Sequence, residues 1–181
     1  MQTLHGRWTT RFIWAAIIQG VFAVIWTLFI VNPFASPAPS MVIASGSAGT
    51  WLLLGYGLFI SVGVVAVAVT ALFYYFIEEM RGRVYSGVSN ALAWAHLTLM
   101  NVGVAGATFL LMYGGYLGGA ALLPTAEGGG GLNAGQVHVT ILQYYVDPIF
   151  YLVIVAVLGV LAGGLGYLVM SKKSLLMARR S

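Results

Sequence analysis

The sequence predicts an all-α integral membrane protein, a four transmembrane helix bundle whose N- and C-termini both lie in the cytoplasm. Composition is the first observation, because 60% of the residues are hydrophobic and 7% are charged, against about a quarter charged in soluble domains. The second is a set of four apolar segments, each long enough to cross the roughly 30 Å hydrocarbon core of a bilayer. The third is the distribution of cations. We expect residues 1–181 to form a single membrane domain.

All eight lysines and arginines fall on one side of the membrane if each apolar segment crosses once. The connections at about 32–50 and 114–147 contain none of them. Short basic loops are retained in the cytoplasm, so both termini and the middle loop of this multi-pass protein should face the inside of the cell (plasma) membrane. The cations are Arg7, Arg11, Arg81, Arg83, Lys172, Lys173, Arg179 and Arg180.

The first apolar segment covers about residues 12–31 and comes after two arginines, as in a signal peptide. A signal peptide has an apolar region of about 7–15 residues, whereas this segment has the length of a full span. We therefore predict a permanent first span. Pro33, Pro37 and Pro39 come directly after it. Since proline lacks an amide donor, they should end the helix and open the first outer loop, residues 32–50.

The second and third spans are predicted at about residues 51–77 and 88–113. The connection between them is short, so the two helices should be antiparallel neighbours in a hairpin. It contains Glu78 and Glu79 beside two arginines. We interpret these charges as a hydrated cap at the inner boundary, with a small effect on stability.

The second outer connection, residues 114–147, is long and rich in glycine. Within it, residues 136–141 alternate polar and apolar side chains like a short strand, but the end of this segment could equally begin an interfacial helix. The pattern leaves both alternatives open. Asp147 followed by Pro148 is typical of an N-cap and a first helical position, which predicts a fourth span at 148–171.

Small residues recur along the predicted helices and indicate close packing. Gly159 and Gly163 are four residues apart, so they share one face of the fourth span, and Gly103 and Ala107 have the same spacing in the third. Such pairs let another helix backbone approach closely. Packing within the bundle is the favoured interpretation, with a contact to another subunit as the alternative.

His96 is the main candidate for chemistry within a span. It lies thirteen residues beyond Arg83, about 20 Å along a helix, which places it near the bilayer centre. A histidine there can bind haem or a metal or carry a proton. Bis-histidine haem needs a second ligand, and Met100 shares the face of His96. The favoured interpretation is a hydrogen bond to a carbonyl, Thr, Asn or Tyr of a neighbouring helix.

His138 is a second, weaker candidate, in or near the outer connection. With Tyr144, Tyr145 and Asp147 close by, it could line a docking surface for a quinol or a soluble electron donor. A solvated loop histidine is the favoured interpretation. No catalytic residue and no metal site is assigned from the sequence.

Several residue types that define other classes of protein are missing. Without cysteine the chain cannot form disulfides, thiolate metal sites, iron–sulfur clusters or c-type haem attachments. The predicted spans contain no lysine for a retinal Schiff base and no carboxylate for ion-coupled transport. No phosphate-binding loop or nucleophile motif appears, so a self-contained enzyme or transporter is not expected. The cations form short clusters that suit orientation and anionic lipid, not nucleic acid.

The stretch LAWAHLTLMNVG, residues 92–103, with the segment ending at Tyr116, resembles the histidine-bearing helices of haem–copper oxidase and nitric-oxide-reductase catalytic subunits. In that family, a histidine followed by apolar residues and a glycine faces the haem or its surroundings. The resemblance implies association with a respiratory complex and makes His96 a haem-neighbouring residue. It does not imply oxidase catalysis, because such a core needs more histidine ligands than the three of this chain.

The sequence therefore predicts an accessory, non-catalytic subunit of a multisubunit respiratory electron-transfer complex, either a terminal oxidase or a quinol-oxidising assembly. The expected partners are other integral membrane subunits and lipid, with quinol or haem held through the complex and no nucleic acid. The alternatives are a small homo-oligomeric channel or pore and a membrane scaffold without cofactor.

Overall fold

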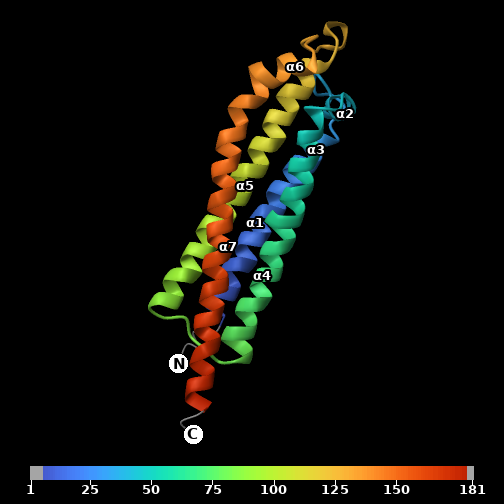
Figure 1. The fold of residues 1–181 in the computed structure, drawn as a ribbon. Helices are drawn as coiled ribbons and strands as arrows, with labels where there is room; N and C mark the ends of the chain where they lie inside the picture. The colour runs from blue at the N-terminus through green and yellow to red at the C-terminus, as the bar shows by residue number, and fades with distance from the viewer. Residues whose placement is uncertain (1–5, 179–181) are drawn as a thin grey trace.

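The computed structural model describes residues 6–178, with side chains as far as Ser171. Over this range the chain is helical and forms no strand, which confirms the all-α prediction. Figure 1 shows a single elongated bundle of long helical segments. Four segments are long and apolar enough to cross a membrane: Arg7–Ile30, Gly49–Met80, Val88–Leu122 and Ala134–Ser171.

The connections alternate between the two ends of the bundle. One end of the bundle, the lower end in Figure 1, holds the start of α1 (Arg7–Ile30), the end of α7 (Gln143–Ala178) and residues 81–87. The short helices α2 (Pro39–Ala44) and α6 (Ala134–Val137) lie at the other. Every cation of the described residues therefore belongs to the first end, whereas Arg179 and Arg180 lie outside the described residues. We call this first end the inner end of the bundle and the opposite end the outer end, as labels for the two ends only.

The second long segment changes its packing partner halfway along its length. Its outer half, α3 (Gly49–Leu58), packs against α5 (Val88–Leu122), whereas its inner half, α4 (Ala66–Tyr75), packs against α1. Between them lies a π-helical stretch, η1 (Phe59–Val65), which contacts both α1 and α5. A π-helical turn holds one residue more than an α-helical turn and so rotates the helix beyond it. A second π-helical stretch, η2 (Phe76–Met80), ends the segment.

The third long helix, α5, is longer than predicted, because residues 114–122 continue it instead of forming a loop. The glycines of this part are buried against neighbouring helices, and two of them face α3. A Cβ at Gly115 would overlap with the backbone of Leu52, and one at Gly119 would lie 2.8 Å from the Cα of Gly49. Glycine here permits contact between two helices, which the sequence interpretation mistook for a turn signal.

The fourth long segment begins before Asp147, so the predicted helix start at Asp147 and Pro148 is wrong. A 3₁₀ turn, η3 (Thr125–Glu127), comes before Asn133. The side chain of Asn133 accepts a hydrogen bond from the backbone N–H of Gln136, and the side chain of Gln136 accepts one from the backbone N–H of Asn133. This capping box starts a helix that continues through a π-helical stretch, η4 (His138–Leu142), into α7. The strand alternative for residues 136–141 is therefore wrong, and Pro148 lies inside α7.

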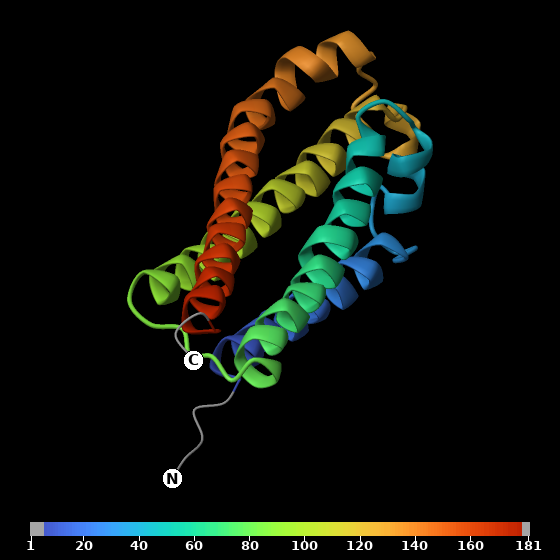
Figure 2. The same ribbon diagram turned by 60° about the horizontal axis from the view of Figure 1, so that its bottom comes forward.

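The bundle is built around α5, which contacts both α3 and α7 (Figure 2). In the inner half of the bundle, Trp8, Phe12, Tyr74 and Tyr85 belong to one apolar cluster. In the outer half, a second cluster includes Phe59. The outward faces of α1 and α7 expose their apolar side chains. Helices that are apolar on all sides suit a lipid environment, so the four long segments are candidate spans of a multi-pass membrane protein.

Candidate functional site

His96 is buried in the inner half of the bundle, with 8% of its surface exposed. It lies eight residues beyond Val88, the first residue of α5, which is about 12 Å along the helix axis. The sequence estimate of about 20 Å from Arg83 assumed a continuous helix. Residues 84–87 are not helical, so His96 lies closer to the inner end of α5 than predicted.

The imidazole of His96 occupies a slot between three helices. Its Nδ1 lies 3.1 Å from the hydroxyl of Tyr74 on α4, within hydrogen-bond distance. One ring neighbour is Phe12 of α1, at 5.0 Å between ring centroids. On α7, a Cβ at Gly163 would overlap with the imidazole. Gly163 of α7 therefore makes room for the imidazole ring, and the hydrogen-bond partner of the ring is a tyrosine of α4.

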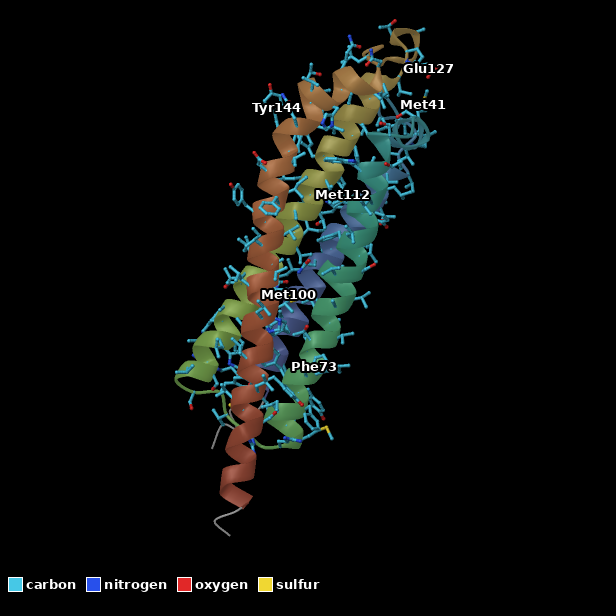
Figure 3. All side chains as sticks on the ribbon, viewed as in Figure 1. Met41, Phe73, Met100, Met112, Glu127 and Tyr144 are labelled. Atoms are coloured by element: carbon cyan, nitrogen blue, oxygen red, sulfur yellow. The ribbon has the colours of Figure 1, made fainter. Side chains whose placement is uncertain are left out.

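A cavity of about 560 Å³ lies beside this pair and opens between α4 and α7. Figure 3 labels Phe73 on α4 and Met100 on α5, which line two of its sides. Its walls are mostly apolar, and His96 and Tyr74 are among the few polar groups that reach them. Within the described residues, the ring of His96 makes one hydrogen bond, through Nδ1, so Nε2 is available to a ligand.

The inner wall of the cavity is closed by Tyr85, from the connection between α4 and α5. Its ring packs 5.2 Å from Tyr74 and 6.5 Å from Trp8, measured between centroids. Burial raises the pKa of the Tyr85 phenol above its ordinary value, and the nearby charge of Glu78 acts in the same direction. Tyr85 therefore stays neutral and serves as an apolar wall with one hydroxyl.

Glu78 is buried, which contradicts its interpretation as part of a hydrated cap. Its carboxylate accepts hydrogen bonds at 3.0 Å from the backbone amides of Trp8 and Thr9 and from the Thr9 hydroxyl. These amides belong to the first turn of α1, whose N-cap residue, Gly6, has no side chain to pair them. A carboxylate from a neighbouring helix therefore performs the capping and also suits the positive end of the helix dipole.

The other face of α5 carries a polar pair that the sequence analysis missed. Gln19 of α1 is buried, and its Nε2 donates a hydrogen bond to Oδ1 of Asn101. The Nδ2 of Asn101 donates in turn to the carbonyl oxygen of Leu97 at 2.6 Å. A glutamine in the middle of an apolar segment was the available signal, because buried amides in membrane helices usually find a partner on another helix.

The small residues predicted to pack helices lie between α5 and α7. A Cβ at Gly103 would lie 2.6 Å from the carbonyl oxygen of Leu152, and one at Gly159 would lie 2.9 Å from the backbone carbon of Leu99. Ala107, one turn after Gly103, is buried on α5. The backbones of the two helices therefore approach each other directly along this line, which we call the α5–α7 contact line.

His138 does not meet His96. It is exposed in η4 at the opposite end of the bundle, which Tyr144 and Glu127 mark in Figure 3. Within the described residues, no three His, Asp or Glu side chains come together as a metal site would require. Met100 lines the same cavity as His96. Within the described residues, His138 is therefore too far away to share a haem with His96.

Comparison with known proteins gives no relative, because no family model, no curated protein and no solved structure matches the chain. The fold places it among helical bundles with four candidate membrane spans.

Proposed function

We propose that the protein is an accessory transmembrane subunit of a respiratory electron-transfer complex, and that the cavity beside His96 holds the ring of a quinone or quinol. One observation carries the proposal: a hydrogen-bonded His96–Tyr74 pair lines an otherwise apolar cavity that opens sideways from the bundle. In a membrane, that opening faces lipid, the phase in which quinones are dissolved.

The cavity has the size and chemistry that a quinone ring requires. Its volume of about 560 Å³ lies within the roughly 300–1,000 Å³ of small-molecule sites, which combine apolar walls with a few placed polar groups. When Tyr74 donates to Nδ1 of His96, the imidazole proton is on Nε2 and can donate to a quinone carbonyl. In the other tautomer, Nδ1 carries the proton and donates to the Tyr74 hydroxyl oxygen, so Nε2 can accept a hydrogen bond from the hydroxyl group of a quinol.

Two further features support a role within a larger complex. One is the resemblance to haem–copper oxidase and nitric-oxide-reductase subunits expected from the sequence around His96, for which the comparisons give no relative, and a single histidine would leave the remaining ligands and the redox partner to other chains. The long, outward apolar face of α7, which includes Tyr151 at 65% and Val157 at 51% exposure, offers a surface for other integral membrane subunits.

The proposed topology is based on the charges. The end of the bundle that carries Arg7, Arg81 and Arg83 faces the cytoplasm, so both termini do as well. Reporter fusions after Arg83 and at the C-terminus should both report the cytoplasm, and a fusion within residues 128–131 should report the outside of the cell membrane. Opposite results at Arg83 and the C-terminus would contradict four crossings.

The proposal is tested on the protein purified from its native membrane in mild detergent. We expect haem bands in the reduced-minus-oxidised spectrum, electron-transfer subunits by mass spectrometry, and quinone in the extract. His96→Leu should remove most of the quinone while the subunits still copurify, and His138→Leu, at the exposed histidine, should leave quinone unchanged. A colourless oligomer of this chain alone, without quinone, would overturn the proposal and favour a homo-oligomeric channel.

A further inference from the structure

A second cavity, of about 530 Å³, lies on the opposite face of α5 from His96, between α5 and α1. On α1 it runs along a single stripe that begins at Arg11 and ends at Phe22. The two cavities share no lining residue and no polar group. We call this second cavity the α1–α5 groove. Its other wall comes from α5 residues between Trp94 and Phe109, with Phe59 at its far end.

The cation at the inner end of the groove is held in place but has no acceptor. The guanidinium of Arg11 lies 4.4 Å from the ring centroids of both Trp8 and Trp94, whose rings meet edge to face at 5.1 Å between centroids, so the cation contacts two indoles. Within the described residues it makes no hydrogen bond, and its buried Nη1 has no partner. Such stacking fixes the orientation of an arginine and leaves its donors for an anion.

The charges around Arg11 favour an anion from outside the chain. Arg7 adds a second positive charge nearby. Its Nη2 donates a hydrogen bond to the Oδ1 of Asn90 at 3.0 Å. Glu78 is the nearby carboxylate, but its oxygens already accept from the amides and hydroxyl at the start of α1. A phosphate group suits the free donors of Arg11, because two of its oxygens can accept parallel, charge-assisted hydrogen bonds from one guanidinium.

The rest of the groove is long enough and apolar enough to accommodate an acyl chain. From Arg11 to Phe22 the α1 stripe rises by about 16 Å, close to half of the roughly 30 Å hydrocarbon thickness. The far end is closed by aromatic rings, with Phe109 at 5.8 Å from Phe22 and 5.1 Å from Phe59 between centroids. The walls are mostly apolar, although Gln19 and Asn101, which are hydrogen-bonded to each other, also line the groove. The Oε1 of Gln19 has no hydrogen-bond partner among the described residues.

We infer that the α1–α5 groove binds one anionic phospholipid, with its phosphate on Arg11 and one acyl chain along α1 as far as Phe22. This site uses neither His96 nor a quinone, so it stands or fails separately from the proposed function. With the basic end of the bundle in the cytoplasm, the lipid belongs to the inner leaflet.

The test is native mass spectrometry of the full-length protein with phosphatidylglycerol or phosphatidylcholine of identical acyl chains. We expect the wild type to prefer phosphatidylglycerol by about fivefold, since a cation near the headgroup contributes on the order of 1 kcal/mol. Arg11→Gln should abolish the preference. Arg81→Gln is the matched control, because Arg81 stacks on Phe76 at the same end of the bundle but lines no groove, and it should keep the preference.

A second variant tests the acyl chain without removing the cation. Val102 lines the groove and is 61% exposed, so Val102→Trp can fill the groove without entering the core. It should reduce retention of both lipids while Arg11 stays in place. An equal loss of preference in Arg11→Gln and Arg81→Gln would show general surface attraction and overturn the inference. Unchanged lipid retention in Val102→Trp would overturn it as well.

Discussion

The two sides of α5 in the inner half of the bundle are packed in opposite ways. Along the α5–α7 contact line, glycines bring backbone against backbone, and a side chain at Gly103 or Gly159 would overlap with the facing helix. At the junction of α1, α4 and α5, rings hold the helices apart, with Phe12 and Tyr74 stacked at 4.7 Å between centroids. Polar groups and cavities occur at the second kind of packing, because rings leave spaces that backbone contact does not.

Gly163 belongs to both kinds of packing. It continues the spacing of Gly159 along α7, but its missing side chain admits the imidazole of His96 and not a backbone. The same residue type therefore builds the contact line at one position and the candidate site at the next turn.

The largest effect is expected where backbone meets backbone. Gly103→Ala should lower the free energy of unfolding by about 3 kcal/mol, because the new Cβ would lie 2.6 Å from the carbonyl oxygen of Leu152 and neither backbone can move easily. The measurement is SDS-induced unfolding in mixed micelles. Gly164→Ala is the control, since a Cβ at Gly164 meets nothing within 4 Å. It should be neutral or stabilising, as alanine favours helix.

Equal destabilisation by both alanine variants would break the comparison, since it would show that the loss comes from helix geometry and not from the close approach of α7.

The next largest effect concerns the junction. Glu78→Ala should cost about 2 kcal/mol, because it leaves the amides of Trp8 and Thr9 buried without an acceptor. The same unfolding titration measures the loss. Glu79→Ala is the matched control, because Glu79 accepts no hydrogen bond from the described residues and should change stability little. If the two variants were equal, the capping role of Glu78 would be refuted.

A third experiment tests whether the imidazole of His96 and a side chain at Gly163 compete for the same space. Gly163→Ala and His96→Ala should each destabilise the bundle, but the double variant should be more stable than the sum predicts, by about 1 kcal/mol. The reason is that removing the imidazole frees the space that the new Cβ needs. Additive losses in the unfolding titration would mean that the ring and the glycine do not compete for one space.

The smallest effect is expected from the amide pair on the other face of α5. A double-mutant cycle of Gln19→Leu and Asn101→Leu should give a coupling of about 0.6 kcal/mol, the usual size for a hydrogen bond between membrane helices. A coupling of zero would mean that the pair fills space without contributing a hydrogen bond.

The sequence was sufficient for the long elements, because length and apolar composition alone determine which segments can be spans. Prediction from the sequence failed where one residue type can serve two structural roles. Glycines 114–119 suggested a loop, yet they continue α5 and pack it against neighbouring helices, with Gly115 and Gly119 facing α3. Asp147 and Pro148 suggested a helix start, but the capping box at Asn133 had already begun that helix.

The candidate site was predictable only in part. His96 stood out as a histidine within an apolar segment, and a tyrosine on a neighbouring helix was among its expected partners. Which tyrosine, and the cavity beside it, depend on how α4 is rotated against α5 and α7. That rotation is set by contacts distant in sequence, such as Gly163 with His96. Glu78 was misjudged because its partners, the amides of α1, lie about seventy positions earlier in the chain.

The π-helical stretch at Phe59–Val65 has a consequence for how the chain would tolerate a deletion. A π-helical turn holds one residue more than an α-helical turn, and each residue turns the helix by about 100°. Removal of one residue from this stretch should keep α3 against α5 but swing Tyr74 away from His96. A deletion that removes no polar group of the cavity would then be enough to dismantle it.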